Sequence, residues 1–311
     1  MNKKVVISIK NLIKSFGELR AVDDLSMDVY SGDIFAFLGS NGSGKTTTIR
    51  CLLDICRPDS GKLLIQGKPY SFALSKTIGY LPEERGMYTR AKVKELFMYF
   101  TDLRNVPIQK AKVLIHDFLT KVDLIQHKDK KISQLSSGMQ QKIQIGLAII
   151  HKPKILILDE PFKGLDPVNR HIFTEIFKEL RDDGTTIMYS THDMDEAQKL
   201  ADRLCIIKNG KRKAYGTPKE VRRSFGKDNI KIEFSGKFPK NNKLYNARVV
   251  NKTAEVIPKK GIKSGEILKY LIKNNLDIIK YELDYPSLNE VFIKICGTEM
   301  HGLRPVDRYH Q

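Results

Sequence analysis

A glycine-rich loop with one lysine and several hydroxyl side chains, GSNGSGKTTT at residues 39–48, is the segment best suited to chemistry. It follows the apolar run 34–38 and leads into a helix-compatible segment, and this order of strand, loop and helix is typical of a phosphate-binding loop. Glycines let the backbone turn tightly and bring its N–H groups against phosphate oxygens at the positive end of the helix. The candidate ligands are Gly39, Ser40, Asn41, Gly42, Ser43, Gly44, Lys45, Thr46 and Thr47.

Two side chains of this loop have more specific expected roles. Lys45 is expected to reach the β- and γ-phosphates, where it would also assist catalysis, and the Thr46 hydroxyl is expected to ligate Mg²⁺. The alternative is an ordinary Gly/Ser loop beside a solvated lysine. The flanking strand and helix favour the phosphate site, so the sequence predicts a bound nucleoside triphosphate with Mg²⁺.

Acidic and imidazole side chains follow two further apolar runs. Asp159 and Glu160 end the first run, and His192 comes shortly after the second. Ligand groups gather at the carboxyl ends of strands in an open α/β sheet. Asp159 is therefore expected to hold Mg²⁺, Glu160 to take a proton from an attacking water, and His192 to hydrogen-bond the γ-phosphate. A solvated acidic loop and a surface histidine are the alternatives.

The chain carries 54 Lys and Arg against 36 Asp and Glu, a formal net charge of +18, which invites a nucleic-acid or membrane-surface interpretation. Residues 227–311 hold 16 of the basic and 10 of the acidic residues, so the excess is spread roughly in proportion to length. No apolar run reaches the roughly 18 residues that span a bilayer. We therefore expect a soluble, cytosol-facing chain.

The hydrophobic pattern predicts an α/β fold for residues 1–225. Alternation over residues 5–32 predicts an antiparallel sheet before the phosphate loop, whereas the continuous runs at 34–38, 155–158 and 187–190 predict a central, mainly parallel sheet. A helical insert is expected over about 84–150. Asn209–Gly210 predicts a hairpin between two further strands.

The pattern changes after residue 225. We expect a small α+β domain over residues 226–297, with strand-like pieces at 230–234, 247–256 and 278–283 and with helices at about 265–275 and 287–295. It contains no catalytic constellation. Residues 298–311 are expected to form a loosely held tail.

These motifs, together with LSSGM at 135–139, resemble the ATP-binding cassette family over residues 4–225. The resemblance implies that the signature motif touches ATP held by a second subunit, that Phe16 stacks on adenine, that Asp166 belongs to a loop joining the two sites, and that His192 is the switch histidine. A core role for Phe16 and a helix cap for LSSG are the alternatives. The implied signature residues are Leu135, Ser136, Ser137 and Gly138.

Three residues depart from the family pattern, namely Glu83 and, in the signature, Ser137 and Met139. Glu83 stands where most cassettes carry glutamine; glutamate can still ligate Mg²⁺ or orient water, but it adds negative charge near phosphate. Met139 replaces the usual glutamine of the signature. The segments YLPEERGMY, MQQKIQ and PSLNEVFIKI resemble the sodium-exporter (NatA-like) subgroup, whose members carry a small C-terminal domain.

The expected function is that of an ATP-hydrolysing subunit of a membrane exporter at the cytoplasmic face of the membrane. Two copies would close around two ATP molecules and drive a separate integral-membrane permease, received near Arg85, Met87 and Tyr88 unless these form an ordinary lobe surface. The alternative is a soluble cassette ATPase acting on nucleic acid or ribosomes; a single phosphate loop and the lack of sustained heptads argue against it, so no nucleic-acid partner is expected. A third hypothesis makes the C-terminal domain a regulatory module.

Overall fold

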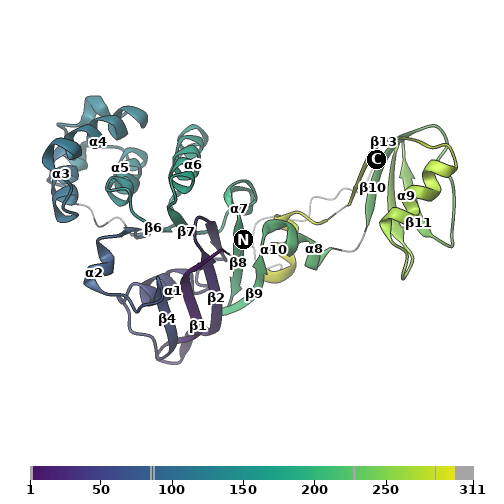
Figure 1. Ribbon diagram of the computed structural model, residues 1–311, viewed down its shortest axis with the longest axis horizontal. Helices are drawn as coiled ribbons and strands as arrows, with labels where there is room; N and C mark the ends of the chain where they lie inside the picture. Colours follow the sequence, from purple (N-terminus) through teal and green to yellow (C-terminus); the bar gives the residue numbers. More distant parts are fainter. Residues whose placement is uncertain (1–2, 85, 87, 227–228, 284, 298–311) are drawn as a thin grey trace. The chain divides into compact units, whose positions relative to one another are not determined.

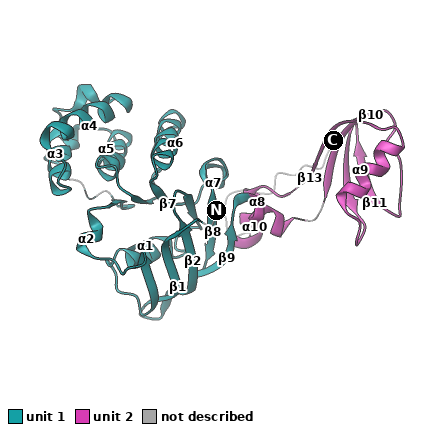
Figure 2. Cartoon of the chain, in the orientation of Figure 1, with its two compact units in different colours: residues 1–218 teal, residues 219–311 magenta. Residues whose placement is uncertain are grey.

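The computed structural model describes residues 3–84, 86, 88–226, 229–283 and 285–297. The chain divides into two compact units, residues 1–218 and 219–311, which are coloured separately in Figure 2. The expected tail over residues 298–311 lies outside the described residues, as do Arg85 and Met87 of the expected permease surface. None of the described helices combines the length and the apolarity that a bilayer crossing requires.

The central sheet of the first unit is mainly parallel, as predicted. Over the described residues its strand order is β5-β6-β7-β3-β8-β9, and only β9 runs antiparallel to its neighbour. All five residues of β3 and of β6 are buried, which explains their unbroken apolar runs. The strands are β3 (Ile34–Leu38), β5 (Ile78–Leu81), β6 (Ile155–Asp159), β7 (Thr186–Thr191), β8 (Arg203–Lys208) and β9 (Lys211–Gly216).

The parallel register brings the carboxyl ends of three strands to one edge. Leu38, the last residue of β3, pairs with Thr191 at the end of β7, and Asp159 at the end of β6 pairs with Ser190. The loops that follow these strands are therefore neighbours, although they lie far apart in the sequence.

A separate antiparallel sheet comprises β1 (Val5–Phe16), β2 (Leu19–Tyr30) and β4 (Ser60–Ile65) in the order β2-β1-β4, which confirms the prediction for residues 5–32. Its buried side chains, such as Ile7 and Ile9, join one core cluster with Phe35 and Phe37 of β3. The antiparallel sheet is thus fixed against the strand that carries the phosphate loop.

Helices make up the rest of the first unit. In Figure 1, α3 and α4 lie beside each other, away from the strands, and Phe97 of α3 packs on Phe118 of α4 with 5.5 Å between ring centroids. The helices are α1 (Lys45–Leu52), α2 (Phe72–Ser75), α3 (Val93–Leu103), α4 (Ile108–Lys121), the 3₁₀ turns η1 (Ile125–His127) and η2 (Ile132–Gln134), α5 (Ser137–Ile149), α6 (Pro167–Asp182) and α7 (Met194–Leu200).

The second unit has the predicted α+β character. Its described strands form one antiparallel sheet in the order β11-β12-β10-β13, and Ile267 and Leu271 of α9 share a buried core with that sheet. Helix α8 begins at Pro218, the last residue of the first unit, and ends at Phe225. The elements are α8 (Pro218–Phe225), β10 (Ile230–Ser235), β11 (Tyr245–Val250), β12 (Thr253–Pro258), α9 (Ser264–Lys273), β13 (Asp277–Leu283) and α10 (Leu288–Cys296).

One expected strand is wrong. The piece expected over 247–256 is two strands, β11 and β12, joined by a tight turn at Asn251, whose φ is 54°. Asparagine enters the left-handed region more readily than most residues. Because neither glycine nor proline marks this turn, the alternation of apolar residues continues through it and conceals the reversal.

Candidate functional site

The phosphate loop connects β3 to α1 and can be built only with glycine at two positions. Gly44 has a φ of 107°, and a Cβ on it would lie 2.4 Å from the carbonyl oxygen of Ala21. A Cβ on Gly39 would lie 2.7 Å from the carbonyl oxygen of Ile207. The loop is therefore held by close backbone contacts with neighbouring strands.

Lys45, the first residue of α1, is buried with 6 % of its surface exposed. Its ammonium donates to the carbonyl oxygens of Gly39 (2.7 Å) and Ser40 (3.2 Å), and it lies 3.5 Å from a carboxylate oxygen of Glu160. The charge is therefore fixed inside the loop, next to an acid from another strand.

A cavity of about 420 Å³ opens over this loop. Besides residues 40–47, its walls include Phe16, Leu19, Glu83 and Glu160. Phe16 is 53 % exposed, which excludes the alternative that it is a buried core residue. A half-exposed ring at the wall of a phosphate-binding cavity can stack on a planar base.

Asp159 lies at the end of β6 and is buried. One of its carboxylate oxygens accepts a hydrogen bond from the Ser190 hydroxyl, whereas Oδ2 is buried without a hydrogen-bond partner among the described residues. Burial raises the pKa of this carboxyl. An unpaired oxygen in such a place is unfavourable unless a cation or donor meets it, so the site fits a bound cation.

The oxygen atoms available for a cation are those that Mg²⁺ prefers. The Thr46 hydroxyl lies 3.5 Å from Oε2 of Glu83, and both residues are close enough to the buried carboxylate of Asp159 to affect its pKa. The described residues contain no group of three His, Cys, Asp or Glu that could hold a metal ion alone. A Mg²⁺ ion here would therefore share its coordination with phosphate oxygens and water, as is usual at phosphoryl-transfer sites.

Glu160 follows Asp159 directly and has a left-handed backbone, with a φ of 52°. Its N–H donates to the carbonyl oxygen (3.2 Å) and the hydroxyl (3.0 Å) of Ser190. Its carboxylate lies 3.0 Å from Nδ1 of His192. A residue other than glycine in this region is strained, and such strain is characteristic of functional sites. Ser190, which fixes both adjacent acids, was not identified as a site residue from the sequence.

A second residue that the sequence analysis missed is Lys163. Its ammonium lies 2.8 Å from Oε1 of Glu83, and this contact is the main cause of a pKa of Glu83 below its usual range. The available signal was a lysine three positions after the adjacent acids, but nothing local connects it to a residue 80 positions earlier.

Comparison with known proteins identifies the family. The family described as "ABC transporter" matches residues 22–163, and the family "ATP-binding protein DrrA1-3-like, C-terminal domain" matches residues 216–296. The chain is 36 % identical to the ABC transporter ATP-binding protein YhaQ of Bacillus subtilis, over 94 % of this chain and 99 % of that protein. The chain is an ABC transporter ATP-binding subunit.

Two further relatives support the fold and activity of this ABC subunit. The Nod factor export ATP-binding protein I of Paraburkholderia xenovorans is 31 % identical over 96 % of this chain and 99 % of its own length. A solved structure of an ATP-binding subunit of an ABC transporter superposes with a TM-score of 0.66 at 29 % identity, over 71 % of this chain and 93 % of that one. The predicted cassette fold is confirmed, and the ABC subunit binds ATP and hydrolyses it in support of transport.

Over the described residues, the signature residues of the ABC subunit are absent from the walls of the 420 Å³ cavity over the phosphate loop. Ser136 caps α5, because its hydroxyl accepts a hydrogen bond from the Met139 N–H at 3.3 Å. The helix cap that was the alternative interpretation of LSSG is therefore present. Gly138 lies close to the loop that contains Asp166, because an added Cβ on Gly138 would lie 3.4 Å from the carbonyl oxygen of Gly164. Asp166 likewise caps α6 through the Asn169 N–H at 3.0 Å. Contact of these residues with ATP stays a prediction.

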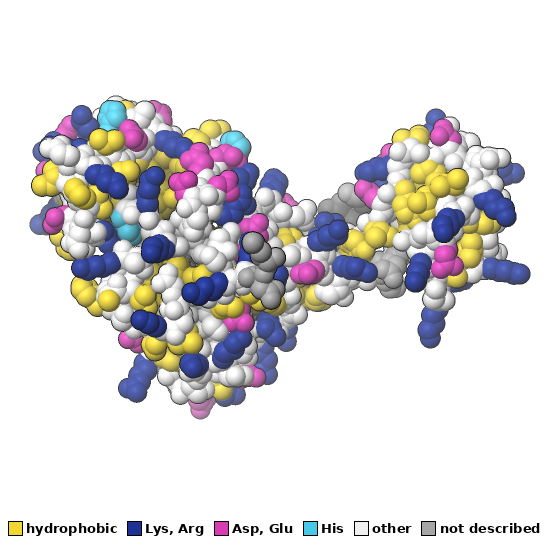
Figure 3. Space-filling model, viewed as in Figure 1, with side chains coloured by type: hydrophobic (Ala, Val, Ile, Leu, Met, Phe, Trp, Pro, Cys, Tyr) yellow, Lys and Arg dark blue, Asp and Glu magenta, His cyan; other side chains and the backbone are white. Residues whose placement is uncertain are grey.

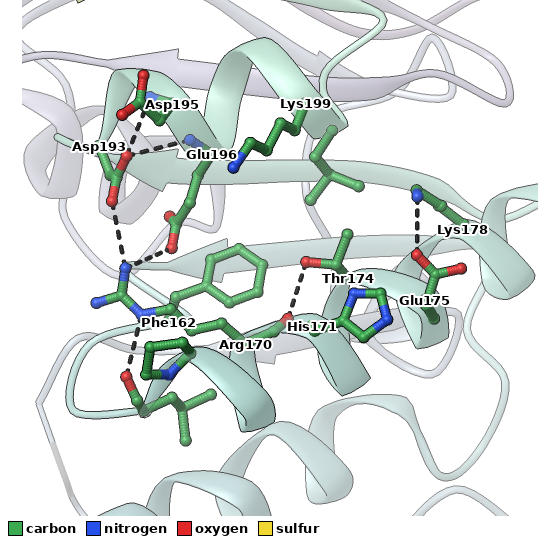
Figure 4. A pocket seen from close by; sticks show the side chains of 13 residues that line it. Phe162, Arg170, His171, Thr174, Glu175, Lys178, Asp193, Asp195, Glu196 and Lys199 are labelled. Atoms are coloured by element: carbon green, nitrogen blue, oxygen red, sulfur yellow. Dashed lines mark hydrogen bonds and ion pairs between the residues drawn. The ribbon is translucent and has the colours of Figure 1, made fainter.

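A larger cavity of about 660 Å³ lies between α6 and α7. In Figure 4, Arg170 reaches towards Asp193 and Glu196, and its Nη1 lies 3.2 Å and 3.0 Å from their carboxylates. Its Nε donates to the carbonyl oxygen of Leu165 at 3.0 Å. Arg170 thus connects the loop of Asp166 to the segment after His192. Among the described residues, the walls of this cavity contain no glycine loop for phosphate. We assign ATP to the smaller cavity because the phosphate-binding chemistry is there.

Proposed function

We propose that this ABC subunit is the ATPase of an exporter, that two copies close around two Mg-ATP, and that they drive a separate permease at the cytoplasmic face of the membrane. The observation that carries this proposal is the position of the Glu160 carboxylate. It lies between the Lys45 ammonium and the His192 imidazole, at the wall of the cavity over the phosphate loop.

The proposed hydrolysis follows from this arrangement. The loop N–H groups and Lys45 bind the β- and γ-phosphates, and Phe16 stacks on adenine. Thr46, Asp159 and Glu83 would hold Mg²⁺, which when bound neutralises charge on the phosphate oxygens. Glu160 accepts the proton of the attacking water, and His192 donates a hydrogen bond to the γ-phosphate.

The positions of the signature residues support a dimer. Leu135, Ser136, Ser137 and Gly138 do not line the ATP cavity of their own chain over the described residues. Ser137–Ile149 is a helix with no acidic residue in its first turn, so its N-terminus can meet an anion. A second copy would bring this helix, with the loop that contains Asp166, to the exposed side of the bound ATP.

Export is proposed from the name of the relative from Paraburkholderia xenovorans, a Nod factor export ATP-binding protein. The proposed permease contact lies near residues 85–88, of which the described Tyr88 has 61 % of its surface exposed. The sodium-exporter subgroup stays a prediction, because neither YhaQ nor the Nod factor export protein is described in those words. The cargo is determined by the permease.

The charge distribution on one face of the molecule favours the exporter over an ATPase that acts on nucleic acid. On the face shown in Figure 3, lysine and arginine side chains are scattered over both units with acidic side chains among them. A nucleic-acid surface would concentrate positive charge along one groove or stripe.

For the C-terminal unit we propose an accessory role in regulation or assembly. Deletion of residues 227–311 should then alter transport and leave basal ATP hydrolysis measurable.

The proposal is tested by co-expressing the chain with a candidate permease, an integral-membrane protein from the same genome. The two chains should co-purify from detergent, and in membrane vesicles ATP should drive transport that the Glu160→Gln variant abolishes. If the purified ABC subunit instead retains RNA or DNA in a salt-sensitive manner and no membrane protein, the exporter assignment is wrong.

A further inference from the structure

The two carboxylate oxygens of Glu83 face different partners. Oε2 lies 3.5 Å from the Thr46 hydroxyl, on the side of the proposed metal site, and Oε1 lies 2.8 Å from the Lys163 ammonium. Cis ligands of an octahedral Mg²⁺ ion lie about 3.0 Å apart, given metal–oxygen distances of about 2.1 Å. The Thr46 and Glu83 oxygens are thus close to the separation at which they could share one cation.

The ion pair between Glu83 and Lys163 is weak enough for another cation to replace the lysine. The side chains are 36 % and 57 % exposed, and ion pairs of this kind contribute on the order of 0–1 kcal/mol. The backbone of Lys163 is fixed, because its N–H donates to the carbonyl oxygen of Glu160 at 3.2 Å. The ammonium is therefore kept within reach of Glu83 by a weak contact that a divalent cation can replace.

We propose that Lys163 is a positioning residue that holds the Glu83 carboxylate in the metal-free site and is displaced when a divalent cation binds with nucleotide. Lys163 thereby competes with the cation for Glu83 and sets the affinity of the site for it. The inference depends on the proposed metal site. It also gives a physical role to the glutamate at this position, since a neutral glutamine would bind both the lysine and the cation more weakly.

The first test measures binding of Mn²⁺ to the full-length protein with saturating ADP, by electron paramagnetic resonance. Lys163→Ala should tighten Mn²⁺ binding by about two- to fivefold, the equivalent of losing a competing exposed ion pair. Lys163→Arg keeps a cation beside Glu83 and should bind Mn²⁺ like the wild type. Glu84→Gln is a matched control, because Glu84 neighbours Glu83 in sequence and pairs with Arg50 at 3.0 Å; it should leave Mn²⁺ binding unchanged.

A double-mutant cycle separates competition for Glu83 from a general charge effect. In a Glu83→Gln background, Lys163→Ala should no longer tighten Mn²⁺ binding. Unchanged or weaker binding in Lys163→Ala, or the same gain in both backgrounds, overturns the inference while the metal site stands. A wild-type protein that binds ADP without Mn²⁺ overturns the proposed metal site as well.

Discussion

The carboxylate of Glu160 lies 3.0 Å from Nδ1 of His192, although the two residues are 32 positions apart and lie on different loops. Pairing of Asp159 with Ser190 brings these loops together, and the Ser190 hydroxyl and carbonyl oxygen both accept from the Glu160 N–H. A carboxylate and an imidazole are therefore held side by side by the fold itself, and such preorganisation reduces the reorganisation that a proposed hydrolysis would require.

Glu160→Gln should slow ATP hydrolysis by about 100-fold or more, because the amide cannot accept the proton of the attacking water. Binding of Mg-ATP should persist, so the variant should accumulate as an ATP-bound dimer. Single-turnover kinetics and light scattering after size exclusion measure the two effects. Turnover at the wild-type rate would remove Glu160 from the role of base.

Lys45→Ala should weaken ATP binding by about 10- to 100-fold, since a charge-assisted hydrogen bond contributes about 1.5–3 kcal/mol. Lys178→Ala is the matched control: this lysine pairs with Glu175 on α6, outside the ATP cavity. Equilibrium binding of a fluorescent ATP analogue compares the two. Equal affinities of the two variants for the ATP analogue would show that the phosphates do not bind at Lys45.

Much of the site could be predicted because local sequence determines it. The five buried residues of β3 and the glycine loop that follows are contiguous, and so are β6 and its two terminal acids. A strand buried on both faces has an unbroken apolar run, and the residue after it lies at the ligand-binding edge. His192 was found by the same reasoning.

The features that were missed depend on contacts between distant residues. No local pattern connects Lys163 to Glu83, or Arg170 on α6 to Glu196 on α7, because such pairs are formed only when the elements pack. The turn at Asn251 was missed for another reason: asparagine adopted the left-handed conformation that glycine usually signals.

Gly44→Ala should destabilise the first unit and abolish ATP binding. A left-handed alanine costs roughly 1–3 kcal/mol, and the clash with the Ala21 carbonyl oxygen must also be relieved by moving backbone. Gly184→Ala is a matched control for the strain alone, since Gly184 has a φ of 95° and nothing lies within 4 Å of an added Cβ. Thermal unfolding and ATP binding distinguish them; equal losses of ATP binding would show that the close contact at Gly44 is irrelevant.

Glu196 should make stability depend on pH near neutrality. Burial, with the nearby Asp193 carboxylate, raises the pKa of Glu196 to about 7 from a usual value of 4.5. Between these values the folded protein binds more protons than the unfolded chain, so stability falls as pH rises from about 4.5 to 7. Ionising the Glu196 carboxyl in the folded protein costs free energy, and the ion pair with Arg170 offsets only part of that cost.

Glu196→Gln removes this titration and should therefore raise the midpoint of thermal unfolding at pH 8, with little effect near pH 5. The gain at pH 8 should be on the order of 1–2 kcal/mol, less than the full pKa difference implies because solvent screens the partly exposed pair. Glu179→Gln, an exposed acid on the same helix as Arg170, should show no such pH dependence. A larger stabilisation at pH 5 than at pH 8 would reverse the sign and exclude Glu196 as its cause.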